Sequence, residues 1–329
     1  MQGERISFAL TFKSSYVLNR RHIRVKVMQS IYAMHQNGSE TMDKQEKFLL
    51  FSIENVLDLY LIMLSALVEI RRKEDYFLDV SSKKHLATPE ERNPNRKFVD
   101  NAILQMLESH QGLEAALAER RIDNWKKNDD YILILLSAIK QSDVYNRYMA
   151  DDMRGFAHDR DFIVKLFTDL IAPNEKLYDY LEDYRLTCVD DIPVVNTQIA
   201  RQLRALESSS SRFEIPRLYK DEEDRDFAVA LFRKTLLNEQ ELAREYTDKT
   251  PNWDTERIAE VDTIILKMAI CEFLKFPSIP VKVTINEYLE IAKEYSTPKS
   301  SIFINGILDN LVKDLRETNR LNKAGRGLL

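Results

Sequence analysis

A short basic segment near the start of the chain carries the clearest chemical signal. Arg20, Arg21 and Arg24 are adjacent or one helical turn apart, and Lys26 follows closely. Guanidinium groups at this spacing can follow a line of phosphates, because arginine presents a planar set of N–H donors that matches phosphate oxygens. The same spacing also fits an ordinary helix with a solvated basic face. The pattern therefore indicates an anion-binding helix and leaves the simpler interpretation open.

The charge of the chain is distributed unevenly. Residues 1–36 hold six Lys and Arg against one Glu, a charge of +5, whereas all 329 residues together carry −5. The remaining chain is therefore at −10. An acidic body with one basic segment predicts a local anionic partner rather than a general attraction to nucleic acid.

Motifs that would mark an enzyme are missing. The sequence has no GxxxxGK[ST], HExxH or GxSxG pattern, and no GxGxxG after an expected strand. The five histidines are scattered, and neither Cys188 nor Cys271 pairs with one at metal-ligand spacing. We therefore expect no catalytic residue, no metal and no cofactor. Unpaired cysteine usage and the absence of an apolar leader predict a reduced, cytoplasmic protein without a membrane span.

The elements that position the basic segment are expected to be helices. Only 7 glycines occur in the chain, too few for the turns and phosphate loops of a doubly wound sheet. Ile23, Val27 and Ile31 share one face of a helix that begins near Asn19. Apolar residues with a helical period recur over about 43–73, 97–119, 129–149, 160–171, 174–186, 193–206, 227–237, 255–273, 284–295 and 303–315. The polar stretch 79–97 is expected to be an exposed loop.

Local signals in the last third of the chain predict how its helices begin and pack. Thr284 and Glu287 have the spacing of a capping box. Ser300 or Ser301 is a candidate N-cap. Gly306 lies inside a helical period and is interpreted as a point of close helix approach.

Several short motifs occur in a fixed order. The first is the basic segment, which runs from Asn19 to Tyr32. A second set begins with Trp253 and Arg257 and continues through D-T-I-I-L-K-M-A-I-C-E at 262–272, P-V-K-V-T-I-N-E at 280–287, E-I-A-K at 290–293 and F-I-N-G-I-L-D at 303–309. Together they resemble the NusB family of transcription antitermination factors. The resemblance covers about 18–40 and 221–315, as in the long, insert-bearing versions that we associate with Bacteroidetes-type sequences.

The resemblance implies an all-α fold, a NusB-like helical bundle with a large additional helical insert. The expected division is an N-terminal extension at 1–17, the first basic helix at 18–40, a helical insert at 41–220, the C-terminal NusB-like domain at 221–316 and a polar tail at 317–329. Residues 1–16 are interpreted as an upstream extension. The insert is either a second binding surface or a helical buttress.

The resemblance also implies a function and its residues. NusB-like proteins bind boxA-type single-stranded RNA together with a NusE-type ribosomal protein, on the RNA polymerase elongation complex, during ribosomal-RNA transcription. The expected RNA-binding residues are Arg20, Arg21, Arg24, Lys26, Lys299, Ser300 and Phe303, and the expected partner-binding residues are Asp262 and Glu272. An exposed aromatic ring such as Phe303 can stack a base. Whether the chain forms a homodimer stays open.

Two other functions compete with this expectation. NusB-like domains also occur fused to ribosomal-RNA methyltransferases, but residues 40–220 show neither a glycine-rich nucleotide loop nor a catalytic cysteine. The second alternative is a protein-only helical scaffold whose RNA site has decayed. A basic surface at Arg20–Arg24 that adjoins Phe303 in the fold would favour the RNA-binding function over this scaffold.

Overall fold

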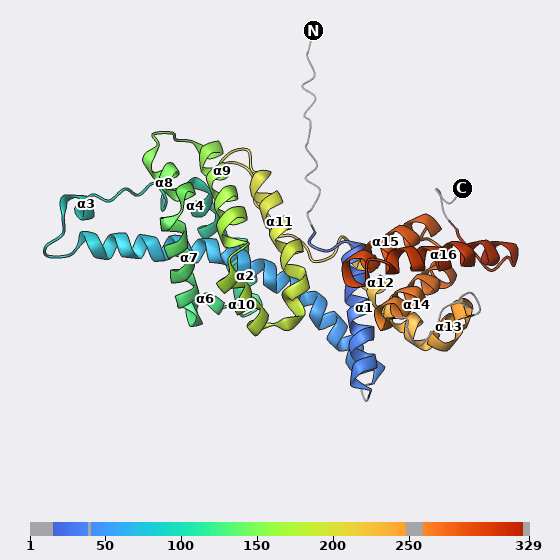
Figure 1. Ribbon diagram of the computed structural model, residues 1–329. Helices are drawn as coiled ribbons and strands as arrows, with labels where there is room; N and C mark the ends of the chain where they lie inside the picture. Colours follow the sequence, from blue (N-terminus) through green and yellow to red (C-terminus); the bar gives the residue numbers. More distant parts are fainter. Residues whose placement is uncertain (1–15, 39–40, 248–258, 325–329) are drawn as a thin grey trace, which may run out of the picture. The chain divides into compact units, whose positions relative to one another are not determined.

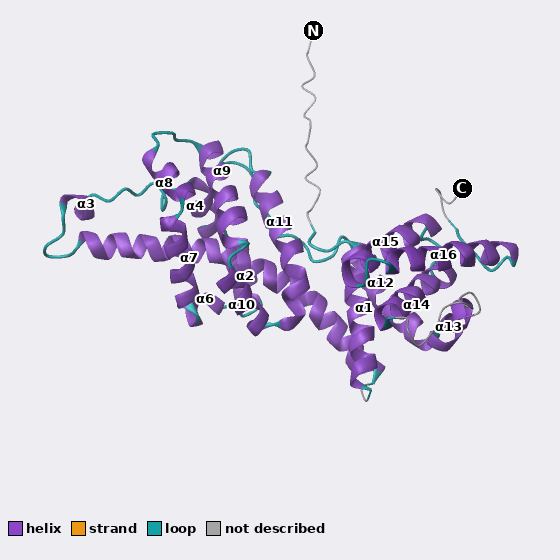
Figure 2. Ribbon diagram, viewed as in Figure 1, coloured by secondary structure: helices purple, strands orange, loops and turns teal. Residues whose placement is uncertain are grey.

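The computed structural model describes residues 16–38, 41–247 and 259–324, and most of these residues are helical (Figure 2). No strand is present among them, and a single parallel bridge joins Tyr16 to Arg217. This confirms the expected all-α fold. Residues 1–15 of the expected extension at 1–17 lie outside the described residues, as do the motif residues Trp253 and Arg257.

The chain divides into two compact units. One contains residues 54–218 together with the start of the chain, and the other contains 18–53 and 219–329. The second unit is made of α1 (Arg20–Asn37), the first part of α2 (Met42–Ser82), α12 (Glu222–Leu237), α13 (Glu239–Thr247), α14 (Glu260–Lys275), α15 (Val281–Tyr295) and α16 (Ser300–Glu317). This unit holds the basic helix and is called the terminal unit below.

Helix α14 is the centre of the terminal unit. It packs against α1, α12, α13, α15 and α16, as the right-hand part of Figure 1 shows. Ten of its sixteen residues are buried, from Asp262 to Phe273. A helix that is apolar on nearly every side must be surrounded by other helices. The uninterrupted apolar character of this motif therefore follows from its place in the core.

The other unit is called the insert unit, and it is built around the rest of α2. Its remaining helices are α3 (Pro89–Arg92), α4 (Ala102–Glu108), α5 (Gln111–Glu119), α6 (Asn124–Lys127), α7 (Asp129–Gln141), α8 (Asp143–Ala150), α9 (Phe156–Leu166) with the π-helical turn η1 (Phe167–Ile171), α10 (Glu175–Tyr184), the 3₁₀ helix η2 (Leu186–Asp191) and α11 (Ile192–Arg204). Buried polar contacts fix several of them on α2. The Trp125 indole N–H donates to the Ile62 carbonyl over 3.0 Å, and the Asp58 carboxylate accepts from both Arg120 and Arg185.

Helix α2 is long and apolar enough to cross a membrane by length and composition alone. Its most apolar window has a mean hydropathy of 1.7, but 67% of that window is buried inside the protein. A core helix of a globular domain shows the same combination.

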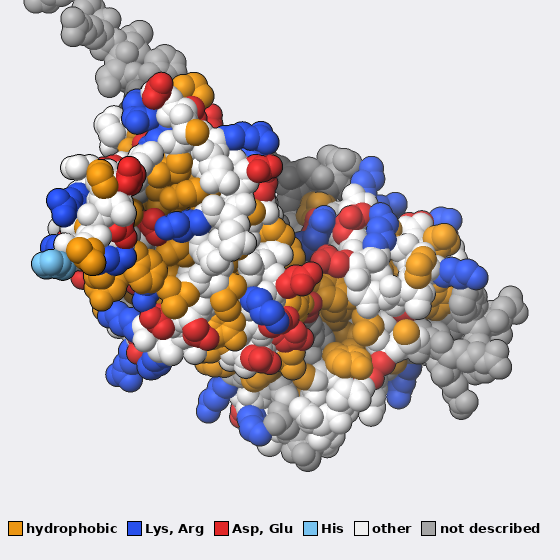
Figure 3. All heavy atoms as spheres, turned by 60° about the vertical axis from the view of Figure 1, so that its left-hand side comes forward, with side chains coloured by type: hydrophobic (Ala, Val, Ile, Leu, Met, Phe, Trp, Pro, Cys, Tyr) orange, Lys and Arg blue, Asp and Glu red, His pale blue; other side chains and the backbone are white. Residues whose placement is uncertain are grey.

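Figure 3 shows acidic and basic side chains interspersed on one face of the molecule, with hydrophobic groups exposed between them.

Several helix boundaries differ from the expectation. The segment 129–149 is two helices, because Ser142 has extended backbone and its side chain caps α8 by accepting from the Tyr145 N–H. The segment 97–119 is likewise divided into α4 and α5. Within the expected loop at 79–97, α2 continues to Ser82 and Pro89 opens the short helix α3. Gly306 is exposed with no atom within 4 Å of an added Cβ, so the expected close helix approach is wrong.

Candidate nucleic-acid interface

Helix α1 begins where the sequence predicts. The Asn19 side chain accepts hydrogen bonds from the backbone N–H groups of Arg21 and His22, at 2.9 and 3.1 Å. In return, the Asn19 N–H donates to Nδ1 of His22, which completes a capping box with an unusual third residue. Burial and the neighbouring Arg21 charge lower the pKa of His22, which suits its role as an acceptor. The cap fixes the direction in which the next residues project.

Arg20 projects toward α12. Its Nε donates to Oδ1 of Asp224 over 2.8 Å, and its guanidinium lies 5.2 Å from the centre of the Phe227 ring. The Arg20 side chain is 39% exposed, whereas Asp224 is almost fully buried in the first turn of α12. A single hydrogen bond uses one of the five N–H donors of an arginine. Arg20 is therefore anchored at one edge and exposed at the other.

Arg21 projects toward α15 and forms a bidentate pair with Glu287. The two hydrogen bonds, from Nε and Nη2, measure 2.8 and 3.0 Å. Hydrogen bonding to Arg21 lowers the pKa of Glu287, and the same bond raises the pKa of Arg21. The Arg21 side chain is 37% exposed. Like Arg20, it is held by a carboxylate and still reaches solvent.

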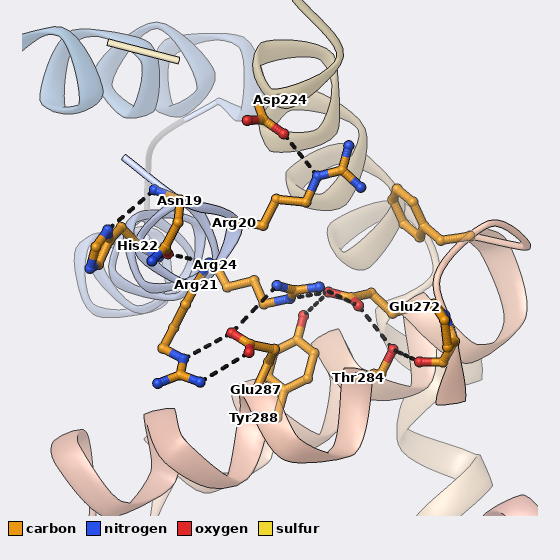
Figure 4. Close-up of polar contacts among 12 residues, drawn as sticks. Asn19, Arg20, Arg21, His22, Arg24, Asp224, Glu272, Thr284, Glu287 and Tyr288 are labelled. Atoms are coloured by element: carbon orange, nitrogen blue, oxygen red, sulfur yellow. Dashed lines mark hydrogen bonds and ion pairs between the residues drawn. The ribbon is translucent and has the colours of Figure 1, made fainter. Parts of the chain in front are cut away.

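Arg24 differs from both because it is buried, with a side chain that is only 2% exposed. Nε and Nη2 donate to the two carboxylate oxygens of Glu272 over 2.6 and 2.9 Å. The hydroxyl groups of Tyr288 and Thr284 also donate to Glu272, over 2.8 and 3.1 Å (Figure 4). Burial opposes the charge on Arg24, but the Glu272 carboxylate more than offsets it and raises the pKa of Arg24. This network joins α1 to α14 and α15.

The buried network corrects three expectations. Arg24 was expected to contact RNA and Glu272 to face a partner. Instead, the two side chains form an ion pair with each other in the protein interior. Thr284 was expected to open a capping box with Glu287. Helix α15 instead begins at Val281 after Pro280, and the Thr284 hydroxyl points into the core toward Glu272. The expected capping glutamate, Glu287, binds Arg21.

A surface pocket of about 440 Å³ lies beside the two exposed arginines. Arg20, Arg21 and Glu287 contribute its polar wall, and Ile279, Pro280 and Val283 are among its apolar residues. The arrangement places positive N–H donors next to an apolar surface. Nucleotides combine a phosphate with an apolar ring face, so the chemistry of this pocket suits them.

The remaining candidate residues are placed differently. Lys26 is only 2% exposed, so its side chain does not belong to the surface of α1. Lys299 is exposed and Phe303 is partly exposed. Ser300 is buried and donates to Oδ2 of Asp262 over 2.7 Å. Lys299 takes the cap position of α16, so neither Ser300 nor Ser301 is the N-cap.

Asp262 is buried as well, with 5% exposure, and its second oxygen Oδ1 accepts no hydrogen bond. The resemblance to the NusB family implied a partner-facing carboxylate at this position. The described residues give Asp262 another task, because it ties the start of α16 to the start of α14. A carboxylate in the first turn of a helix also interacts favourably with the positive end of the helix dipole.

The arginine group and the Lys299–Phe303 segment contact different parts of α14. Arg24 binds Glu272 and Ser300 binds Asp262, and these two acidic residues stand ten positions apart on that helix. At a rise of about 1.5 Å per residue, the two anchor points are about 15 Å apart along its axis. The candidate residues therefore form two separate groups on the described part of the terminal unit, so the expected basic surface adjoining Phe303 is not found and a single RNA site made of both groups is wrong.

Sequence reasoning missed the carboxylates that hold the arginines. Asp224 lay in an acidic run at 221–226, a pattern that is usually solvated. Glu287 belonged to a recognised motif, but it was expected only to cap its own helix together with Thr284.

No group of three or more His, Cys, Asp or Glu side chains within the described ranges could hold a metal ion.

These features define an all-α helical module in which α1 presents two half-exposed arginines and is held to the core by a third. The NusB family model matches residues 196–313. The chain is similar to transcription antitermination protein NusB of Salinibacter ruber, with 46% identity over 112 residues, which is 34% of this chain and 70% of that protein. The chain belongs to the NusB family.

Two further relatives carry the same name. The NusB protein of Chloroherpeton thalassium is 39% identical over 32% of this chain and 50% of its own length. That of Clostridium kluyveri is 45% identical over 28% of this chain and 58% of its own length. No solved structure gives a significant match. The family match begins inside α11, earlier than the expected boundary at 221, and it does not include α1.

Proposed function

We propose that this chain is an RNA-binding transcription antitermination factor. In this proposal it binds boxA-type single-stranded RNA together with a NusE-type ribosomal protein on the elongating RNA polymerase, in the cytoplasm, and supports ribosomal-RNA transcription. The observation that carries it is the pair of half-exposed arginines, Arg20 and Arg21, at the capped start of α1 beside a pocket with apolar walls. The relatives named transcription antitermination protein support the same class of function.

The mechanism is assembly without covalent chemistry. Arg20 and Arg21 donate to RNA phosphates through the N–H groups that their carboxylate partners leave unused. Arg24 does not touch the RNA in this proposal. It positions Arg20 and Arg21, because its buried pair with Glu272 holds α1 against α14. Three exposed contacts, from Arg20, Arg21 and Lys299, correspond to a slope of log affinity against log salt of about −2 for a single strand.

Phe303 and Lys299 form the second contact in this proposal. Phe303 is partly exposed one turn into α16, and Lys299 is exposed at its cap position. A base stacked on an aromatic ring contributes about 1–3 kcal/mol. The NusE-type partner then binds the neighbouring surface. Asp262 supports that surface from inside by holding Ser300.

The test is fluorescence anisotropy of a labelled boxA-type RNA with the full chain, with and without the NusE-type protein, across a salt series. We expect tighter binding with the partner present. We also expect the Arg20→Ala, Arg21→Ala double variant to weaken binding at least about tenfold, because it removes two charge-assisted contacts. Arg147→Ala is the matched control, since Arg147 is an exposed arginine of the insert unit.

Equal binding by the arginine variant and the control would overturn this proposal. Indifference to RNA both with and without the partner would support the alternative function, a protein-only helical scaffold. The insert unit would then be the place to search for the partner of that scaffold.

A further inference from the structure

Two internal carboxylates, Asp224 and Glu287, occupy the positions that phosphate groups would take on Arg20 and Arg21. We infer that these carboxylates set the selectivity of the RNA site, because a ligand must displace or share both of them to bind. This inference rests on the proposed function. An anion with at least two suitably spaced phosphates competes successfully with Asp224 and Glu287 for the arginines, whereas an isolated anion does not.

The contacts on Arg21 show how complete the occupation is. Glu287 takes the Nε–Nη2 edge with two hydrogen bonds of 2.8 and 3.0 Å. This is the fork geometry with which arginine also binds phosphate. Phosphate can therefore use that edge only by displacing Glu287, or it must accept the weaker contact to the remaining N–H groups.

Asp224 acts on Arg20 in the same way but is more firmly fixed. Its side chain is 5% exposed, in the first turn of α12. Glu223 adds a second, more distant negative charge 3.7 Å from Arg20. Asp224 therefore stays in place, and an RNA phosphate must share Arg20 with it through the opposite edge of the guanidinium.

Each carboxylate also helps to hold α1 on the terminal unit. Glu287 lies 3.9 Å from Nη1 of Arg24 as well as binding Arg21, and Asp224 joins α1 to α12. Removing the negative charge should therefore weaken the docking of α1 and strengthen RNA binding together. If these carboxylates had a purely structural role, removing their charge would lower both the stability of α1 docking and the affinity for RNA.

The test compares Glu287→Gln and Asp224→Asn with the unaltered chain for binding to a labelled single-stranded boxA-type RNA. Partly exposed ion pairs contribute little each, so we expect about threefold tighter binding for Glu287→Gln and about tenfold for the double variant. The matched controls are Glu294→Gln and Asp226→Asn, which make the same charge change on the same helices. Both Glu294 and Asp226 are exposed.

Competition by inorganic phosphate gives a second measurement. The unaltered chain should lose little RNA at phosphate concentrations that displace RNA from the double variant, once ionic strength is matched. Thermal unfolding of each variant records the stability change, which we expect to have the opposite sign to the affinity change. Glu287→Gln provides the test if the buried Asp224→Asn change prevents folding.

The outcomes separate the two proposals. If the unaltered chain binds RNA and Arg21→Ala weakens it, but Glu287→Gln binds no more tightly than Glu294→Gln, the carboxylates do not set selectivity and only this inference is wrong. Equal tightening by variant and control would have the same meaning, because it would reflect net charge alone. If Arg20→Ala and Arg21→Ala leave RNA binding unchanged, the proposed function itself is wrong.

Discussion

Arg24 and Glu272 face each other in the interior of the terminal unit, with both carboxylate oxygens bonded to the guanidinium at 2.6 and 2.9 Å. They are 248 positions apart in the sequence. The basic helix is therefore attached to the core through the one arginine of its group that does not reach solvent. The half-exposed arginines depend on this attachment for their positions.

Arg24→Ala should strongly destabilise the terminal unit. It leaves the Glu272 carboxylate buried without its charge partner, a change that typically costs about 3–5 kcal/mol. Amide hydrogen exchange of α1 and α14 would measure the loss locally. Arg21→Ala is the comparison, and it should cost about 1 kcal/mol or less because that pair is half exposed.

Replacing both partners, as Arg24→Met with Glu272→Leu, should recover part of the loss, because no buried charge then remains unpaired while the Tyr288 hydroxyl loses its acceptor. Equal protection of α1 amides in Arg24→Ala and in the unaltered chain would contradict the anchoring role of this pair.

Ser300→Ala should loosen the start of α16. The Ser300 hydroxyl is the donor to Oδ2 of Asp262, whose other oxygen already lacks a hydrogen bond. Leaving a buried carboxylate without that donor costs about 1–3 kcal/mol. Hydrogen exchange over residues 296–304 would report the change. Ser301→Ala, which removes a hydroxyl with more exposure, should have little effect, and the reverse order would refute the assignment.

Lys323 should make stability rise with pH under alkaline conditions. Its ammonium donates to the carbonyls of Glu272 and Phe276 at the end of α14, and burial lowers the pKa of Lys323 from 10.5 to about 8. Between these two values the unfolded chain binds the proton more strongly than the folded chain. The contribution of this group to the free energy of unfolding therefore increases from about pH 8 to 10.5.

Urea unfolding of the unaltered chain and of Lys323→Met across that pH range would measure the difference in slope. Lys293→Met is the control, because Lys293 is exposed. Parallel pH profiles for the unaltered chain and Lys323→Met would show that burial of this ammonium has no part in folding.

RNA length should affect binding in two stages. The arginine group and the Lys299–Phe303 segment are anchored about 15 Å apart on α14, which is about four or five stacked nucleotides at about 3.4 Å each. The affinity for oligonucleotides of three nucleotides should fall with Arg21→Ala but not with Phe303→Ala. Those of eight or more should respond to both. Equal sensitivity of the shortest RNA to both changes would mean that the two groups form a single site.

Local features of this fold could be predicted from the sequence. The helical period located α1, α14, α15 and α16, and Asn19 marked the start of α1 because a cap depends only on residues within one turn. Helix ends were less accurate. The break at Ser142 depends on a cap inside an otherwise continuous apolar period, and the period alone does not reveal it.

The arrangement of the site could be predicted only in part. The spacing of Arg20, Arg21 and Arg24 placed them on one basic helix, but it did not show which of them is buried. That depends on Glu272, Tyr288 and Thr284, which are distant in sequence and come together only in the folded core. For the same reason the paired carboxylates Asp224 and Glu287 carried no signal of their own.

The discontinuity of the terminal unit has a consequence for synthesis. Helix α1 is the first described helix to leave the ribosome, but its partner Glu272 follows 248 residues later. At about 5–20 residues per second, that delay is roughly 10–50 s. The nascent chain must carry an uncovered apolar face and a cluster of cations throughout this interval, while the insert unit is completed. Residues 54–218 make up most of the chain synthesised during this interval, so the size of the insert unit largely determines how long α1 waits for its partner.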